Sequence, residues 1–141
     1  MSGAWAVAVA AVFVWLGMVL AISFLEAPLK FRAPGVTLRM GLGIGRLVFR
    51  ALNICELLLA ALIVGTFAFH GPPIRVEAAA GVAIGALVVQ VLLVRPALTR
   101  RSDAVLGGAD EPRSRGHYVY IAFEAIKTIA LLWTGILLLG A

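Results

Sequence analysis

Glu124 and Lys127 are charged residues inside a predominantly apolar stretch that runs from Tyr118 to Ala141. The stretch is long enough to cross a bilayer, because about 20 helical residues span the hydrocarbon core. A charge at that depth costs at least about 2.5 kcal/mol. Residues three apart lie on one helical face, where opposite charges can pair. The pair therefore indicates either specific packing inside a helix bundle or the handling of a polar ligand.

A second buried carboxylate is predicted at the same depth. Glu56 lies in another apolar stretch, and both stretches are expected to start near the same membrane face. A contact between Glu56 and Lys127 across helices is then geometrically natural, and two acids share one base. The acid without a salt bridge would hold a proton or pair with Arg50. These residues predict a proton-titratable or cation-binding site, with a purely structural ion pair as the alternative.

Every apolar stretch contributes polar side chains to the same half of the membrane. The opposite half is almost wholly apolar, which favours a polar cavity open to one side over a continuous pore. The residues expected to bind a ligand or ion are Glu26, Asn53, Glu56, Gln90, Tyr120, Glu124 and Lys127.

Basic residues surround the expected mouth of this cavity, beside the glycine-rich run Gly41–Gly45. Backbone N–H groups at a helix start attract anions, and glycines permit a close approach. A lipid phosphate could therefore bind there, although basic residues at a membrane face also act as topology determinants and head-group contacts. The residues expected to contact the phosphate are Arg32, Arg39, Arg46 and Arg50.

The composition excludes an ordinary soluble domain. Of the 141 residues, 13% are charged and 62% are hydrophobic, whereas soluble domains carry about 25% charged residues. The net charge of +5 does not indicate nucleic-acid binding, because the basic residues cluster beside apolar segments. Membrane lipids are the expected partners. Cys55 is the one cysteine and is expected to pack in the interior, so no disulfide, metal site or cofactor is predicted.

The elements that position these residues are four predicted membrane spans, at residues 4–25, 44–69, 78–94 and 118–139. They predict an all-α polytopic four-helix bundle formed by a single domain, residues 1–141. Pro28 and Pro34 are expected to interrupt the first helix, Thr37 to cap a short piece before the glycines, and residues 95–116 to form a long solvated loop.

The arginine-rich first and third connections set the expected orientation. The positive-inside rule places both in the cytoplasm and both termini on the outer side of a bacterial inner (plasma) membrane. Gly81 and Gly85 form a GxxxG pattern in the third span. Such small residues serve close packing within the bundle or an interface between copies of the chain, and a homo-oligomer is one expectation.

Two short runs, Phe24–Phe31 and Gly45–Glu56, resemble small bacterial four-helix integral membrane proteins of unknown function with a TMEM-type pattern. That pattern has Pro-x-x-Phe after the first helix, as in Pro28 to Phe31, and Gly-x-x-x-Phe at the start of the second, as in Gly45 to Phe49. The resemblance implies that the first connection and the start of the second helix define the fold. It carries no known activity.

The leading functional hypothesis is a small membrane protein that binds or transports a small molecule or ion in a charged cluster open to the cytoplasm. One alternative is a membrane-embedded enzyme that acts on a phosphate-bearing lipid, with Glu56 or Glu124 as acid or base. The other is a structural assembly subunit whose charges only fix the register of the helices.

Overall fold

The computed structural model describes the backbone of residues 2–106 and 115–141 and the side chains of residues 2–100 and 118–141. Within these residues the chain is helical and contains no strand, which confirms the predicted all-α class. Four helices are long and apolar enough to cross a membrane. They are Gly3–Lys30, Leu38–Phe69, Ile74–Arg100 and Tyr118–Gly140.

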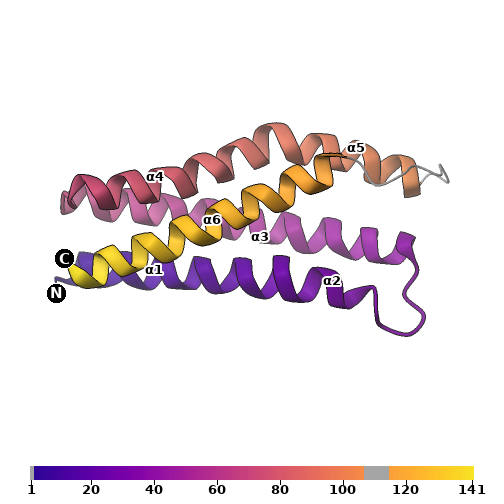
Figure 1. The fold of residues 1–141 in the computed structure, drawn as a ribbon, viewed down its shortest axis with the longest axis horizontal. Coiled ribbons are helices and arrows are strands. Elements are labelled where there is room, and N and C mark those ends of the chain that lie inside the picture. Colours follow the sequence, from indigo (N-terminus) through magenta and orange to yellow (C-terminus); the bar gives the residue numbers. More distant parts are fainter. Residues whose placement is uncertain (1, 107–114) are drawn as a thin grey trace.

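The four helices lie side by side, and the two termini are at the same end of the bundle (Figure 1). The first comprises α1 (Gly3–Val19), a π-helical segment (Leu20–Glu26) and α2 (Ala27–Lys30). The second is α3 (Leu38–Phe69). The third comprises α4 (Ile74–Val89), a π-helical segment (Gln90–Val94) and α5 (Arg95–Leu106), and the fourth is α6 (Arg115–Gly140).

Pro28 does not interrupt the first helix, contrary to the prediction. It lies in the first turn of α2, where a missing backbone N–H is tolerated. The preceding segment is π-helical, and the N–H of Ala27 donates to the carbonyl of Ile22, five residues earlier. The chain turns only after Lys30, and Gly35 adopts a φ of 81° there, in the left-handed region that glycine favours.

The second helix begins earlier than predicted. Thr37 is its N-cap, and the Thr37 hydroxyl accepts a hydrogen bond from the N–H of Met40 at 3.1 Å. No separate piece precedes the glycines, because Gly41–Gly45 lies inside the continuous α3. The glycine N–H groups therefore do not form a helix N-terminus, so that part of the argument for a phosphate site is wrong.

The third helix extends beyond both predicted ends. It starts at Ile74 and continues through Arg95 into α5, where a solvated loop was expected. A second π-helical segment joins the two parts, and the N–H of Arg95 donates to the carbonyl of Gln90. The rest of the predicted loop, residues 107–114, lies outside the described residues.

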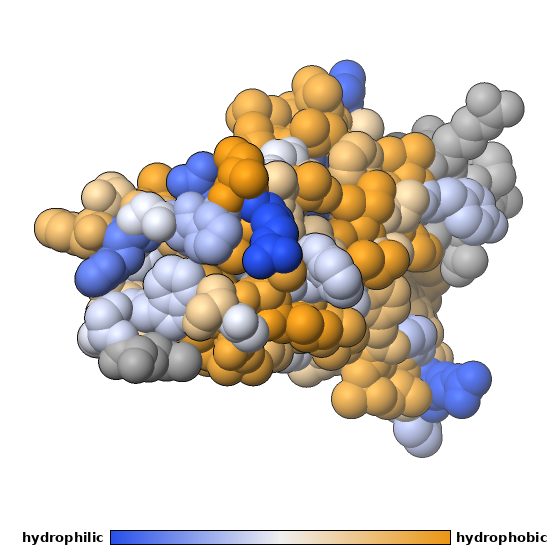
Figure 2. Space-filling view, turned by 60° about the vertical axis from the view of Figure 1, so that its left-hand side comes forward, coloured by the Kyte–Doolittle hydropathy of each residue, from blue (hydrophilic) through white to orange (hydrophobic). Residues whose placement is uncertain are grey.

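The apolar core occupies the half of the bundle that contains the termini. Its members come from all four helices and include Val12, Ile63, Val76, Leu131 and Leu138, each at most 1% exposed. Hydrophobic side chains also cover most of the face visible in Figure 2. Apolar residues both inside and outside are the pattern of a helix bundle surrounded by lipid.

Candidate functional site

A fully buried ion-pair triad lies near the middle of the bundle. The Lys127 Nζ atom is 2.5 Å from Glu56 Oε2 and 2.6 Å from Glu124 Oε1, and none of the three residues is more than 1% exposed. The structure thus confirms the predicted contact between Glu56 and Lys127. Two carboxylates share one ammonium group, also as predicted.

Each carboxylate accepts further hydrogen bonds. The indole N–H of Trp15 donates to Glu56 Oε2 at 2.7 Å. The amide of Gln90 donates to Glu124 Oε1 at 2.8 Å, and the Ser23 hydroxyl donates to Glu124 Oε2. All four helices therefore contribute to one buried network, which consists of Trp15, Ser23, Glu56, Gln90, Glu124 and Lys127.

Both π-helical segments lie at the level of the network and supply two of its members, Ser23 and Gln90. A π-helical turn differs from an α-helical turn in the direction in which it projects its side chains, and such turns occur frequently at functional sites. In the described residues, π-helical backbone is confined to these two segments. Local backbone geometry therefore helps to aim polar groups at Glu124.

The other predicted ligand-binding residues do not join the network. Glu26 is half-buried, with its carboxylate 3.9 Å from the ammonium group of Lys30. Asn53 is buried, and its Oδ1 atom accepts no hydrogen bond from the described residues. Tyr120 takes part only through its carbonyl, which accepts from Gln90 at 3.3 Å. Arg50 is exposed and pairs with neither carboxylate.

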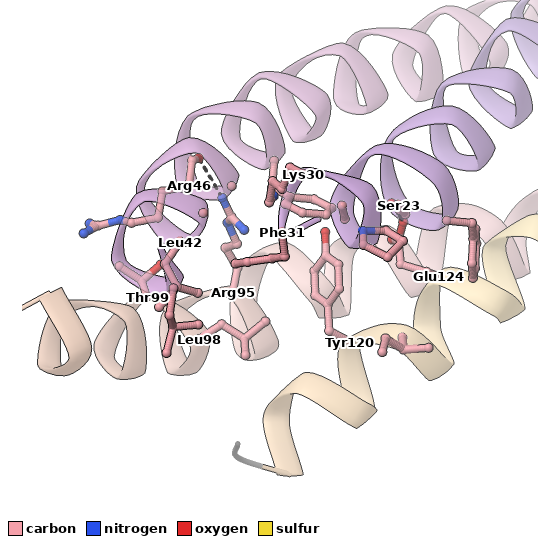
Figure 3. Close-up of a pocket in the computed structure, with 18 residues that line it drawn as sticks. Ser23, Lys30, Phe31, Leu42, Arg46, Arg95, Leu98, Thr99, Tyr120 and Glu124 are labelled. Carbon is pink, nitrogen blue, oxygen red and sulfur yellow. Dashed lines mark hydrogen bonds between the residues drawn. The ribbon is translucent and has the colours of Figure 1, made fainter. Parts of the chain in front are cut away.

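A cavity of about 460 Å³ lies in the half of the bundle away from the termini, and Figure 3 shows the residues that line it. It lies between α2, the start of α3, α5 and the start of α6. Its volume is in the range of about 300–1,000 Å³ that is typical of small-molecule sites. Ser23 and Glu124 line this cavity and also belong to the buried network. The wall of the cavity and the buried network therefore share two residues.

Of the four arginines predicted to bind phosphate, the described cavity lining contains Arg46 alone. Arg32, Arg39 and Arg50 are exposed and lie outside that lining. The other cationic residues of the described lining, Lys30 and Arg95, were not predicted from the sequence to bind a ligand. The position of Arg95 directly after an apolar stretch is the feature that could have drawn attention to it. Its place in the cavity wall becomes clear only because the helix continues past it.

Two network residues were also missed as functional candidates. Trp15 looked like a further apolar residue of the first span, yet a buried indole N–H almost always needs an acceptor. This need for an acceptor could have indicated that Trp15 contacts a buried polar group. Ser23 is adjacent to Phe24 in an apolar run, and its hydroxyl donates to Glu124 from within a π-helical segment.

The half of the bundle at the termini offers little polar chemistry. The hydroxyls of Thr66 and Thr134 donate to carbonyls of their own helices, those of Ile63 and Ala130, at 2.7 Å each. Gly81 and Gly85 are exposed, and a Cβ atom added to either would meet nothing within 4 Å. Their role in a homo-oligomer stays a prediction.

Comparison of the chain with protein-family models, with curated proteins and with solved structures found no match.

Proposed function

We propose that this protein is a multi-pass membrane protein that binds a small molecule in its 460 Å³ cavity and transports it. One observation carries the proposal. Glu124 lines the cavity and is also paired with Lys127 in the buried triad, so a ligand in the cavity lies beside a group whose charge is balanced deeper in the bundle. A purely structural ion pair has no need of such an opening.

The positive-inside rule supports an orientation with the cavity facing the cytoplasm. Basic residues concentrate around this end of the bundle, where the two connections other than His70–Pro73 lie. Both termini would then be on the outer side of a bacterial inner membrane. In this orientation the ligand enters from, or leaves to, the cytoplasm.

The network gives the bound state a way to couple to protons. Glu56 and Glu124 carry two negative charges against the single positive charge of Lys127, so the triad either has a net charge of −1 or holds one proton. A charged ligand in the cavity lies close to Glu124 and changes the electrostatic potential at the triad. Binding would therefore change the proton affinity of the triad. Transport would also require the tightly packed half at the termini to open while the cavity closes.

The test is native mass spectrometry of the protein after gentle extraction from its own membrane. Leu42 lines the cavity, and Leu42→Trp would fill part of it. Leu47→Trp is the matched control, because Leu47 is on the same helix but 72% exposed and outside the lining. We expect a discrete bound mass in the native protein and in Leu47→Trp, and its loss in Leu42→Trp. Thermal unfolding of both variants would verify that they fold.

A protein that carries only bulk lipid, with identical spectra for all three chains, would refute a ligand in the cavity. The buried triad would then have a structural role, in fixing the register of the four helices.

A further inference from the structure

The described lining of the cavity has more positive than negative charge. Lys30, Arg46 and Arg95 line it, and Glu124 is the one carboxylate among the described lining residues. Both oxygens of that carboxylate are occupied, because Lys127 and Gln90 contact one and the Ser23 hydroxyl the other. Glu26, which is 3.9 Å from Lys30, lies outside the described lining, so that lining favours an anionic ligand over a cationic one.

Two of these cations lie around one aromatic ring. The Lys30 Nζ atom is 5.6 Å from the centre of the Phe49 ring, and the Arg95 Cζ atom is 5.8 Å from it. Arg95 donates one hydrogen bond to a described residue, to the carbonyl of Arg46 at 3.1 Å (Figure 3). A guanidinium group has five N–H donors, so Arg95 keeps donors for an anion.

The Tyr120 hydroxyl is a further donor in the cavity. Tyr120 is 6% exposed, and its hydroxyl has no hydrogen-bond partner in the described part of the chain. Its ring packs edge-on against Phe49, with ring centres 5.5 Å apart, and its hydroxyl points away from α6 and lies among the other residues that line the cavity (Figure 3). A buried hydroxyl without a partner is unfavourable, and a ligand oxygen would satisfy it.

The remaining described wall is mainly apolar. It includes Phe24, Phe31, Leu42, Phe49, Leu98 and Ile121. Such a wall favours a hydrocarbon group, because burial of apolar surface contributes about 25 cal/mol per Å².

We infer that the ligand of this cavity is an amphipathic anion, which has a phosphate or carboxylate head and a hydrocarbon part. The head lies between Lys30 and Arg95 and accepts the hydrogen bond of Tyr120. The hydrocarbon part lies against the apolar wall. This inference depends on the proposed function and specifies its ligand class. The anion could be a membrane lipid or a free amphiphile, and the two share this chemistry.

The test is calorimetric titration of the purified protein in neutral detergent with hexyl phosphate. Hexyltrimethylammonium, which has the same chain and the opposite charge, is the comparison probe. We expect hexyl phosphate to bind at least about tenfold more tightly, since each hydrogen bond to a charged group is worth about that factor. Inorganic phosphate and dioleoyl phosphatidic acid then serve as competitors. Displacement mainly by phosphatidic acid would identify a lipid as the source, and displacement by inorganic phosphate a soluble anion.

Variants connect the binding to the named residues. Lys30→Met/Arg95→Gln should weaken hexyl phosphate binding about tenfold or more, and Tyr120→Phe about threefold to tenfold. Arg32→Gln/Arg39→Gln is the matched control, because it removes the same charge from exposed residues outside the described lining and should leave the affinity unchanged. Tyr120→Phe changes a single oxygen and keeps the test usable if the double variant does not fold.

Two outcomes overturn the inference in different ways. If hexyltrimethylammonium binds as tightly as hexyl phosphate and Leu42→Trp blocks it, the cavity binds ligands but the anionic class is wrong. If neither probe binds and Leu42→Trp has no effect on the native mass spectrum, both the inference and the proposed function fail.

Discussion

The two halves of the bundle differ in the residues that fill their interior. At the termini, apolar side chains such as Val12, Leu131 and Leu138 fill the interior, and threonine hydroxyls bond to their own helices. At the other half, charges are buried, backbone segments are π-helical and a cavity opens. Packing and polar chemistry are therefore separated along the helix axis. Lys127 lies where the two halves meet.

The largest expected effect is the loss of that lysine. Lys127→Met leaves two buried carboxylates without their shared cation, and removal of one partner of a buried ion pair destabilises a protein by about 3–5 kcal/mol. Denaturant unfolding in detergent micelles measures this loss. Glu56→Gln/Glu124→Gln/Lys127→Met should recover most of the stability, because no buried charge is then left unpaired.

The matching change in the apolar half is Thr134→Val. Its hydroxyl bonds only to the carbonyl of Ala130 in the same helix, so the variant should lie within about 1 kcal/mol of the native protein. Equal unfolding free energies for Lys127→Met and Thr134→Val would mean that the two halves do not differ as described.

The second prediction is a loss of stability smaller than that of Lys127→Met, and it concerns the indole donor of the network. Trp15→Phe keeps an aromatic ring in the core but removes the hydrogen bond to Glu56, which should cost about 1.5–3 kcal/mol because the acceptor is charged. Trp133→Phe is the control, since Trp133 is 56% exposed and should change stability by at most about 0.5 kcal/mol. Indistinguishable unfolding curves for the two variants would remove Trp15 from the network.

The third prediction compares two glycines that each face an aromatic ring. A Cβ atom at Gly135 would lie 2.6 Å from the Phe13 ring in the apolar half, and one at Gly41 would lie 2.1 Å from the Phe31 ring beside the cavity. Gly135→Ala should lower the unfolding free energy by about 1–3 kcal/mol through overpacking. Phe31 is exposed and can rotate, so Gly41→Ala should mainly alter ligand binding.

Gly43→Ala controls for the helix propensity of alanine at a nearby site. A Cβ atom there meets nothing within 4 Å, and the change should stabilise the helix by about 1 kcal/mol or less. The contrast between the halves would be refuted if Gly41→Ala destabilised the fold as much as Gly135→Ala and left ligand binding intact.

Hydropathy predicted the four long helices, because an apolar stretch of about 20 residues has few other stable forms. It could not predict where the helices end, since capping by Thr37 and continuation through Arg95 depend on polar residues that lie outside the apolar window. Pro28 was misinterpreted because its position in the first turn of α2 becomes apparent only when the preceding π-helical segment is known.

The sequence predicted the charged residues at the centre of the site but not the cations of the cavity wall. A contact between Glu56 and Lys127 could be predicted, because charges in a membrane need partners and both residues were expected at similar depths. Lys30 could not be placed from the sequence. Its ammonium group reaches the cavity by packing on Gly45, where a Cβ atom would lie 2.9 Å from Nζ. That contact depends on how the chain turns between α2 and α3.

The two π-helical segments have an evolutionary consequence. A π-helical turn closes its hydrogen bonds over five residues where an α-helical turn uses four, so each segment accommodates one additional residue. Deletion of a single codon within Leu20–Glu26 would allow the segment to close as an ordinary α-helix, while Trp15 and Lys30 on either side keep their places. In this way the protein could gain or lose the hydroxyl that contacts Glu124 through heritable length changes that preserve the bundle.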